Sequence, residues 1–284
     1  MRRALSALAV LVGLASLPAP AAAGGWVQKE GGFYGKLTSR LLIGSAAYGA
    51  GGESVSVPSY LDSQLNLYLE VGVHERVTVV GLLTPYGRAR VDGEDSAHYL
   101  GPFVAGARVG LLTEGPTRVA VEAHYGYAPS AIGTDRLLDA DFTADDGTDL
   151  QVVYRPAVET HRVELQGQVG RGFAIRDTPA WVTGMLGVRL NTGFEHALTG
   201  YGQVGVQPWR FRFDFHVSLY EPFFQTVELT NVSGVGNTRY LGAGFGIAFA
   251  LSDNVGLTLD ADGVFYAQSN ARTPSFAFGI EGRL

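Results

Sequence analysis

The stretch that decides the fold is YLDSQLNLYLEVGVHERVTVVG, residues 60–81. Successive side chains of a β-strand point to opposite faces, so residues two apart share a face. One face of this stretch carries leucine and valine, while the other carries polar side chains that include Asp62, Gln64 and Glu70. The alternation is about twice as long as an ordinary strand of five or six residues. It reaches the length of about 9–11 residues that a tilted strand needs to cross a bilayer.

The same alternation recurs along the chain and predicts twelve strands: 33–43, 60–73, 77–86, 99–112, 118–128, 157–170, 180–192, 198–206, 211–220, 239–250, 255–267 and 275–284. Tight turns such as 74–76 alternate with long polar loops such as 129–156 and 221–238. Two connectors depart from this layout, since 171–179 is long for a turn and 193–197 is short for an outer loop. Even strand number, short turns at one end and long loops at the other are typical of bacterial outer-membrane barrels.

The predicted fold class is therefore all-β, a transmembrane antiparallel up-and-down β-barrel of about 12 strands. A soluble periplasmic sandwich remains the alternative, because a single amphipathic strand looks the same in both folds. No cysteine occurs in the sequence, so disulfides and cysteine metal sites are excluded.

The N-terminus has the features of a secretory signal peptide. Arg2 and Arg3 form a basic start, an apolar stretch covers 4–17, and alanines at 21–23 provide a small-residue cleavage site. The predicted organisation is a signal peptide, 1–23, followed by an outer-membrane β-barrel domain, 24–284. The predicted location is the bacterial outer membrane after export.

Aromatic residues at the predicted strand ends are expected to form belts at the lipid headgroups. They are Tyr60, Tyr86, Tyr99, Tyr127, Trp181, Tyr220 and Tyr240. The final strand, SFAFGIEGRL, resembles the C-terminal signal that the outer-membrane assembly machinery recognises, although it ends in Leu284 where that signal usually has Phe or Trp. The expected partners are thus membrane lipid, the assembly machinery and a small-molecule solute.

Charged side chains on the polar faces are predicted to line the lumen in equal numbers of each sign. The cations are Lys36, Arg40, Arg108, Arg118, Arg162, Arg189, Arg212 and Arg283, and the anions are Asp62, Glu70, Glu122, Glu164, Asp214, Asp260, Asp262 and Glu281. Charges in a confined interior are costly unless they are paired, so cross-strand arginine–carboxylate pairs are expected. A polar network that stiffens the wall is favoured over a selectivity filter.

Removal of Arg2 and Arg3 from a chain of 21 basic and 27 acidic residues leaves 19 against 27, a balance of −8. No basic stripe for nucleic acid is visible. The densest acidic segment is DADFTADDGTD, 139–149, whose spacing does not fit a calcium loop. A solvated acidic surface is therefore favoured over a metal site.

Asp214, His216 and Ser218 share one face and are the residue types of a hydrolase triad. Same-face neighbours in a strand lie about 6.8 Å apart, however, which is too far for hydrogen bonds between triad members. We therefore predict no catalytic residue and no cofactor. The separated histidines 98, 124, 161 and 196 show no metal-ligand spacing either.

Four stretches, 26–37, 69–79, 179–190 and 251–259, carry a resemblance to a known group of proteins. The chain resembles small outer-membrane barrels of Gram-negative bacteria, including the transporters grouped with the meta-pathway of phenol degradation. The resemblance implies passage of small solutes, aromatic ones included, and assigns no ligand residues.

The leading hypothesis is a passive channel or facilitator for small solutes. One alternative is a non-conducting surface barrel whose acidic outer loops bind partners or cations. A less favoured alternative is an outer-membrane hydrolase at His216 and its two same-face neighbours.

Overall fold

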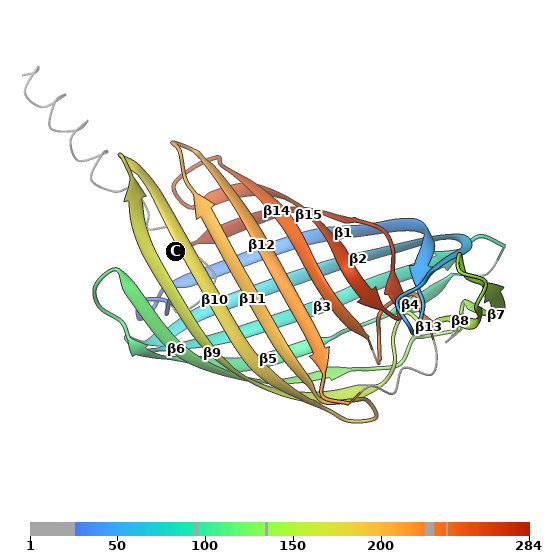
Figure 1. Ribbon diagram of the computed structural model, residues 1–284. Coiled ribbons are helices and arrows are strands. Elements are labelled where there is room, and N and C mark those ends of the chain that lie inside the picture. Colours follow the sequence, from blue (N-terminus) through green and yellow to red (C-terminus); the bar gives the residue numbers. More distant parts are fainter. Residues whose placement is uncertain (1–25, 94–95, 134–135, 225–229, 237) are drawn as a thin grey trace, which may run out of the picture.

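The computed structural model describes residues 26–93, 96–133, 136–224, 230–236 and 238–284 (Figure 1). The predicted signal peptide, 1–23, lies outside these residues. Within the described ranges, no helix is long and apolar enough to cross a membrane.

Twelve long strands form the barrel: β1 (Phe33–Tyr48), β2 (Ser54–His74), β3 (Val77–Val91), β5 (Phe103–Leu112), β6 (Thr117–Ala128), β9 (Thr160–Ile175), β10 (Thr178–Asn191), β11 (Ala197–Val206), β12 (Phe211–Pro222), β14 (Arg239–Ala250), β15 (Val255–Gln268) and β17 (Ser275–Arg283). Each pairs antiparallel with the next barrel strand along the chain. The last strand, β17, pairs with β1 and closes the barrel. The predicted fold class is confirmed.

The barrel has two distinct ends (Figure 1). At the end that we call the turn end lie the C-terminus and the short connectors, such as those joining β2 to β3 and β14 to β15. At the opposite loop end lie the longer connections. Two of these connections contain a separate three-stranded sheet of β7 (Leu138–Thr143), β8 (Asp149–Tyr154) and β13 (Thr230–Asn231).

Several predicted loops are partly strand. The predicted loop after residue 43 is mostly strand, because β1 continues to Tyr48 and β2 begins at Ser54. The predicted long connector 171–179 is wrong, since β9 reaches Ile175 and β10 begins at Thr178. These segments extend the ladder beyond the clear alternation of apolar and polar residues, which was the signal that marked strands in the sequence.

Two short strands extend the barrel sheet at the loop end, β4 (Ala97–Tyr99) against β3 and β16 (Asn270–Ala271) against β1. The predicted strand 99–112 is therefore split into β4 and β5. Pro102 lies at the break and has no N–H to donate to a ladder.

The outer wall is apolar, as the sequence alternation requires. Along β9, Val163, Leu165 and Val169 are exposed, whereas Glu164 and Gln168 between them are buried inside the barrel. An exposed apolar surface that runs round a closed barrel needs lipid rather than water to cover it.

The expected aromatic belt is partly wrong. Tyr60, Tyr99, Trp181 and Tyr220 are buried rather than exposed, because they lie on the inward face of their strands. Tyr86 is exposed as expected. Position near a strand end does not decide the face of a side chain, which depends on whether its position is odd or even along the strand.

At the loop end the inner wall and the three-stranded sheet form one apolar core. Val55 and Val91 of the barrel pack in it with Val152 and Tyr154 of β8, all at most 1% exposed. The small sheet therefore forms a lid over the mouth of the barrel, and we use the word lid for β7, β8 and β13 below.

Replacing Leu186, which is 58% exposed on the outer face of β10, tests the lipid-facing wall. Leu186→Arg is expected to lower the free energy of unfolding by about 2–4 kcal/mol, because it places a cation near the bilayer midplane. Leu251, 48% exposed in the turn after β14, is the matched control. Leu251→Arg should cost only about 0–1 kcal/mol. Urea unfolding in lipid vesicles measures both, and equal losses would contradict this placement.

Candidate functional site

Three charged side chains meet on the inner wall near the turn end. Arg108 of β5 lies between two carboxylates, with Nη1 2.9 Å from Glu70 Oε1 and Nε 2.5 Å from Glu122 Oε2. The three side chains are 4%, 8% and 5% exposed. Glu122 is the direct cross-strand partner of Arg108, whereas Glu70 lies on β2 beyond the intervening β3. The expected arginine–carboxylate pairing is therefore present here, with one cation between two anions.

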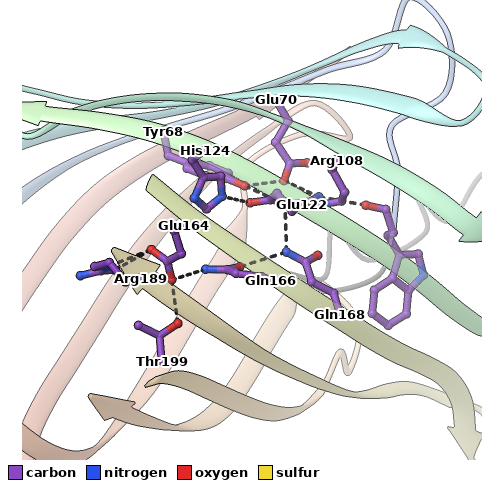
Figure 2. A network of polar contacts seen from close by, with 11 residues as sticks. Tyr68, Glu70, Arg108, Glu122, His124, Glu164, Gln166, Gln168, Arg189 and Thr199 are labelled. Carbon is purple, nitrogen blue, oxygen red and sulfur yellow. Dashed lines mark hydrogen bonds and ion pairs between the residues drawn. The ribbon is translucent and has the colours of Figure 1, made fainter. Parts of the chain in front are cut away.

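The cluster continues round the wall as a chain of hydrogen bonds (Figure 2). Gln168 donates to Glu122 (3.0 Å) and to Gln166 (3.3 Å), and Gln166 donates to Glu164 (2.7 Å). Glu164 also accepts from Arg189 Nε of β10 (2.9 Å) and from Thr199 of β11 (2.7 Å). The network thus joins strands from β2 to β11 and stiffens this side of the wall.

The residues that precede β1 lie inside the barrel at the turn end, and we call 26–32 the N-terminal segment. Its backbone carbonyl at Trp26 accepts from Arg108 (2.9 Å), and Gln28 donates from its backbone to Thr78 (2.8 Å) and from its side chain to Glu70 (2.6 Å). A Cβ on Gly72 would lie 2.0 Å from the Lys29 carbonyl oxygen, so only glycine permits this approach. The position of this segment inside the barrel could not be predicted from the sequence, because the segment has no alternation of apolar and polar residues.

A second cluster is formed by side chains of β1, β12, β15 and β17. Arg212 donates to both oxygens of Glu281, at 3.0 and 2.8 Å, and Tyr34 donates to the same carboxylate at 3.0 Å. Lys36 of β1 pairs with Asp260 of β15 at 2.8 Å rather than with a carboxylate of the neighbouring β2. The two ion pairs skip intervening strands, because barrel curvature brings their partners together, whereas Tyr34 reaches Glu281 on the neighbouring β17.

Near the loop end, Asp62 anchors the lid. Its carboxylate accepts from Tyr99 (2.6 Å) and from Tyr154 of β8 (3.1 Å), while Gln64 donates to Tyr99 (2.8 Å). Arg40 donates to Ser275 (3.2 Å). Asp62 therefore holds a lid strand against the barrel wall.

The three residues considered for a hydrolase do not form a triad. His216 contacts Asp262 through Nε2 (2.7 Å) and Asp214 through Nδ1 (3.4 Å), so both ring nitrogens face carboxylates. The expectation that same-face neighbours lie too far apart to bond is therefore wrong for Asp214 and His216, because their side chains bend toward each other along the strand. Ser218 is not among the hydrogen-bond partners of this histidine in the described chain. Within the same described ranges, no three His, Asp or Glu side chains are grouped to hold a metal ion.

Three further predicted lumen residues lie outside these clusters. Arg118 of β6 has a buried Nη1 without a partner among the described residues. Arg283 lies opposite Tyr34 at the turn end. Arg162 of β9 lines a cavity near the loop end.

The acidic segment 139–149 forms most of the β7–β8 hairpin, and its carboxylates have local partners. Asp139 accepts from Gln151 (2.9 Å) and from Arg136, which lower the pKa of the Asp139 carboxyl below its usual value. Asp149 accepts from Thr143 across the hairpin (2.9 Å). Part of the acidic composition therefore serves to hold the lid hairpin.

The interior contains adjoining cavities that share lining residues. We call them the outer cavity, of about 260 Å³, the middle cavity, of about 320 Å³, and the inner cavity, of about 210 Å³. Arg162 and Arg189 line both the outer and the middle cavity. Tyr68 and Tyr201 line both the middle and the inner cavity. Sequence periodicity placed these side chains on the inner face but could not show which of them line the same cavity.

No family model matches the sequence, and no curated protein matches it at a significant level. Solved structures do share its fold. An outer membrane channel from Pseudomonas putida F1 superposes with a TM-score of 0.63 at 10% identity, over 93% of this chain and 99% of that one. The translocator domain of the autotransporter NalP from Neisseria meningitidis gives 0.52 at 11% identity, over 90% of each chain. The NanC porin gives 0.51 at 7% identity, over 88% of this chain and 100% of that one.

Identities this low establish the fold and nothing finer. The closed twelve-stranded architecture, with its apolar outer wall, is that of an outer-membrane β-barrel. The channel and porin named above share this architecture, as does the translocator domain.

Removing the cation of the first cluster tests the importance of charge pairing inside the wall. Arg108→Gln leaves two buried carboxylates without their shared partner and is expected to lower the free energy of unfolding by about 3–5 kcal/mol. Urea unfolding in lipid vesicles provides the measurement.

The matched control is Arg90, which is 56% exposed and 3.4 Å from Asp92. Arg90→Gln should cost less than about 1 kcal/mol, since an exposed pair contributes little. The double variant Arg108→Gln with Glu122→Gln should recover part of the loss. A loss no larger than that of the control would contradict the proposed role of the cluster.

Proposed function

We propose that the protein is a passive channel or facilitator for small solutes in the outer membrane of a Gram-negative bacterium. The observation that carries this proposal is the row of three adjoining cavities along the barrel interior. A barrel needed only as an anchor could fill its interior with packed side chains, as small barrels do.

The lining of the cavities is suited to solutes that are partly polar. The inner cavity is lined by charged and amide side chains such as Lys36, Gln203 and Asp214. The outer cavity has several aromatic and apolar side chains, among them Tyr99, Phe194 and Val235. The names of the channel and the porin with the same fold are consistent with this proposal, although they do not identify a solute.

Passage through the row requires two internal segments to move. The N-terminal segment occupies the turn end, where Gln28 lines the inner cavity. The lid covers the loop end, where Tyr154 reaches Asp62 on the wall. The N-terminal segment is held by a few hydrogen bonds that could exchange for bonds to water, unlike the continuous ladders of the barrel. The lid is also held by its apolar core, so its movement requires more of the structure to open.

The resemblance to the transporters of the phenol-degradation meta-pathway extends the proposal to small aromatic solutes. We propose in addition that the signal peptide 1–23 is cleaved after export and that the assembly machinery recognises the C-terminal strand. On that strand Phe276, Phe278 and Ile280 are exposed on the outer face.

Deleting 26–30 tests the channel proposal. The shortened protein is folded and inserted into a planar bilayer. It should show a larger single-channel conductance than the full mature chain, because the N-terminal segment no longer occupies the inner cavity. Gln28→Glu should act in the same direction, since it places a second carboxylate against Glu70. Lys29→Gln is the matched control and should leave conductance unchanged, because this side chain is exposed and outside the contacts of Gln28.

Folding of each variant is checked by heat-modifiable migration on a gel. A folded deletion variant that conducts no ions would remove the channel proposal and leave the barrel architecture intact.

The second candidate is a non-conducting surface barrel that binds cations or partners through its lid. It is favoured by the exposed carboxylates of Asp141 and Asp145 on the acidic hairpin. If it is right, Asp141→Asn with Asp145→Asn should abolish calcium binding in a titration while conductance stays the same. Calcium binding that persists in this variant would contradict it.

A further inference from the structure

Arg162 differs from the paired arginines of the inner wall. It lies on β9 and lines both the outer and the middle cavity. Arg108, Arg189 and Arg212 each pair with a carboxylate at 3 Å or less. Among the described residues, Arg162 makes neither an ion pair nor a hydrogen bond, although its side chain is only partly exposed.

The carboxylate nearest in the strand, Glu164, is already occupied. Its two oxygens accept from Arg189, Gln166 and Thr199 at 2.7 to 2.9 Å. Arg189 is in turn held by this carboxylate and by the ring of Tyr220, 5.4 Å from its guanidinium carbon. Because the oxygens of Glu164 are already bound, Arg162 has no direct ion-pair partner among the described residues at the junction of the two cavities.

The backbone is shaped to accommodate the side chain of Arg162. Gly126 of β6 is its direct cross-strand partner. A Cβ at that glycine would lie 2.7 Å from Arg162 Nε and 2.9 Å from its Cγ. The missing side chain therefore lets the arginine lie flat against the wall, with its guanidinium at the cavity surface.

The outer cavity combines this cation with an apolar and aromatic lining. Tyr99, Tyr220 and Tyr240 line it together with Pro156 and Phe194. No carboxylate is among the described residues that line it. Its volume of about 260 Å³ lies just below the range of about 300–1,000 Å³ of pockets for drug-sized ligands. The cavity thus suits a compact solute about as large as a single substituted ring.

We propose that Arg162 binds the carboxylate of a small organic acid whose apolar body lies against the tyrosines of the outer cavity. A guanidinium presents paired N–H donors that match the two oxygens of a carboxylate. Such a cation beside aromatic rings favours an anion that has an apolar body, since the ring faces stabilise that body. The inference rests on the proposed channel function and names its solute class.

The test uses the full mature chain, folded in detergent, and isothermal titration calorimetry with detergent-only titrations subtracted. Sodium benzoate should bind at least about tenfold more tightly than benzyl alcohol, which has the same ring without the charge. Inorganic phosphate should also bind more weakly than benzoate, because it has no apolar body.

Three variants test whether benzoate binds at Arg162 or elsewhere in the interior. Arg162→Gln should weaken benzoate binding about tenfold or more and leave benzyl alcohol unchanged. Gly126→Ala should weaken benzoate as well, because the added Cβ displaces the guanidinium without removing its charge. Arg40→Gln removes an inner-face arginine that is outside the lining of the outer and middle cavities and should leave benzoate binding intact.

Benzoate that binds no more tightly than benzyl alcohol or phosphate would overturn the proposal. Undiminished benzoate binding by both Arg162→Gln and Gly126→Ala would overturn it as well. Because binding in detergent is independent of conductance, a protein that conducts ions without binding benzoate would disprove this site alone. A protein that binds benzoate without conducting would instead contradict the channel proposal.

Discussion

Every backbone N–H and C=O of a strand in hydrocarbon needs a partner within the protein, because lipid provides none. The ladder between β1 and β17, from Tyr34–Arg283 to Leu42–Ser275, meets this requirement for the first and last barrel strands. The sheet consequently has no open edge along its wall. Once the wall is closed, the alternation in each strand assigns one face to lipid and the other to an enclosed interior, on which all other features depend.

The enclosed interior forces its charges to pair. Arg108 lies between Glu70 and Glu122, and Arg212 makes a two-oxygen contact with Glu281. An unpaired buried charge would be costly, so these networks stabilise the wall and leave little free charge to select solutes. Against that background Arg162 has no carboxylate partner among the described residues, and its position beside an aromatic cavity connects wall chemistry to solute binding.

Both ends of the interior are filled by segments outside the barrel ladders. The N-terminal segment contacts the first charge cluster through Trp26 and Gln28. The lid packs its own apolar residues against the barrel mouth and donates from Tyr154 to Asp62. Charge pairing and occlusion are linked at the turn end, because Glu70 binds Arg108 and also accepts from Gln28 of the N-terminal segment. What remains between them is a row of cavities suited to small molecules.

The sequence by itself determined the faces, the number of strands and the turn-and-loop layout, since side-chain direction in a strand follows a period of two whatever its neighbours are. The strand predicted at 239–250 coincides with β14. The sequence did not determine that 171–179 is mostly strand or that Lys36 pairs with Asp260 two strands away. Those outcomes depend on where each strand leaves the apolar band and on which inner faces the curvature of a closed barrel brings together. Only the tertiary structure decided the charge partners, the docking of the N-terminal segment and the division of the interior into cavities, because contacts between distant segments leave no periodic signal in the chain.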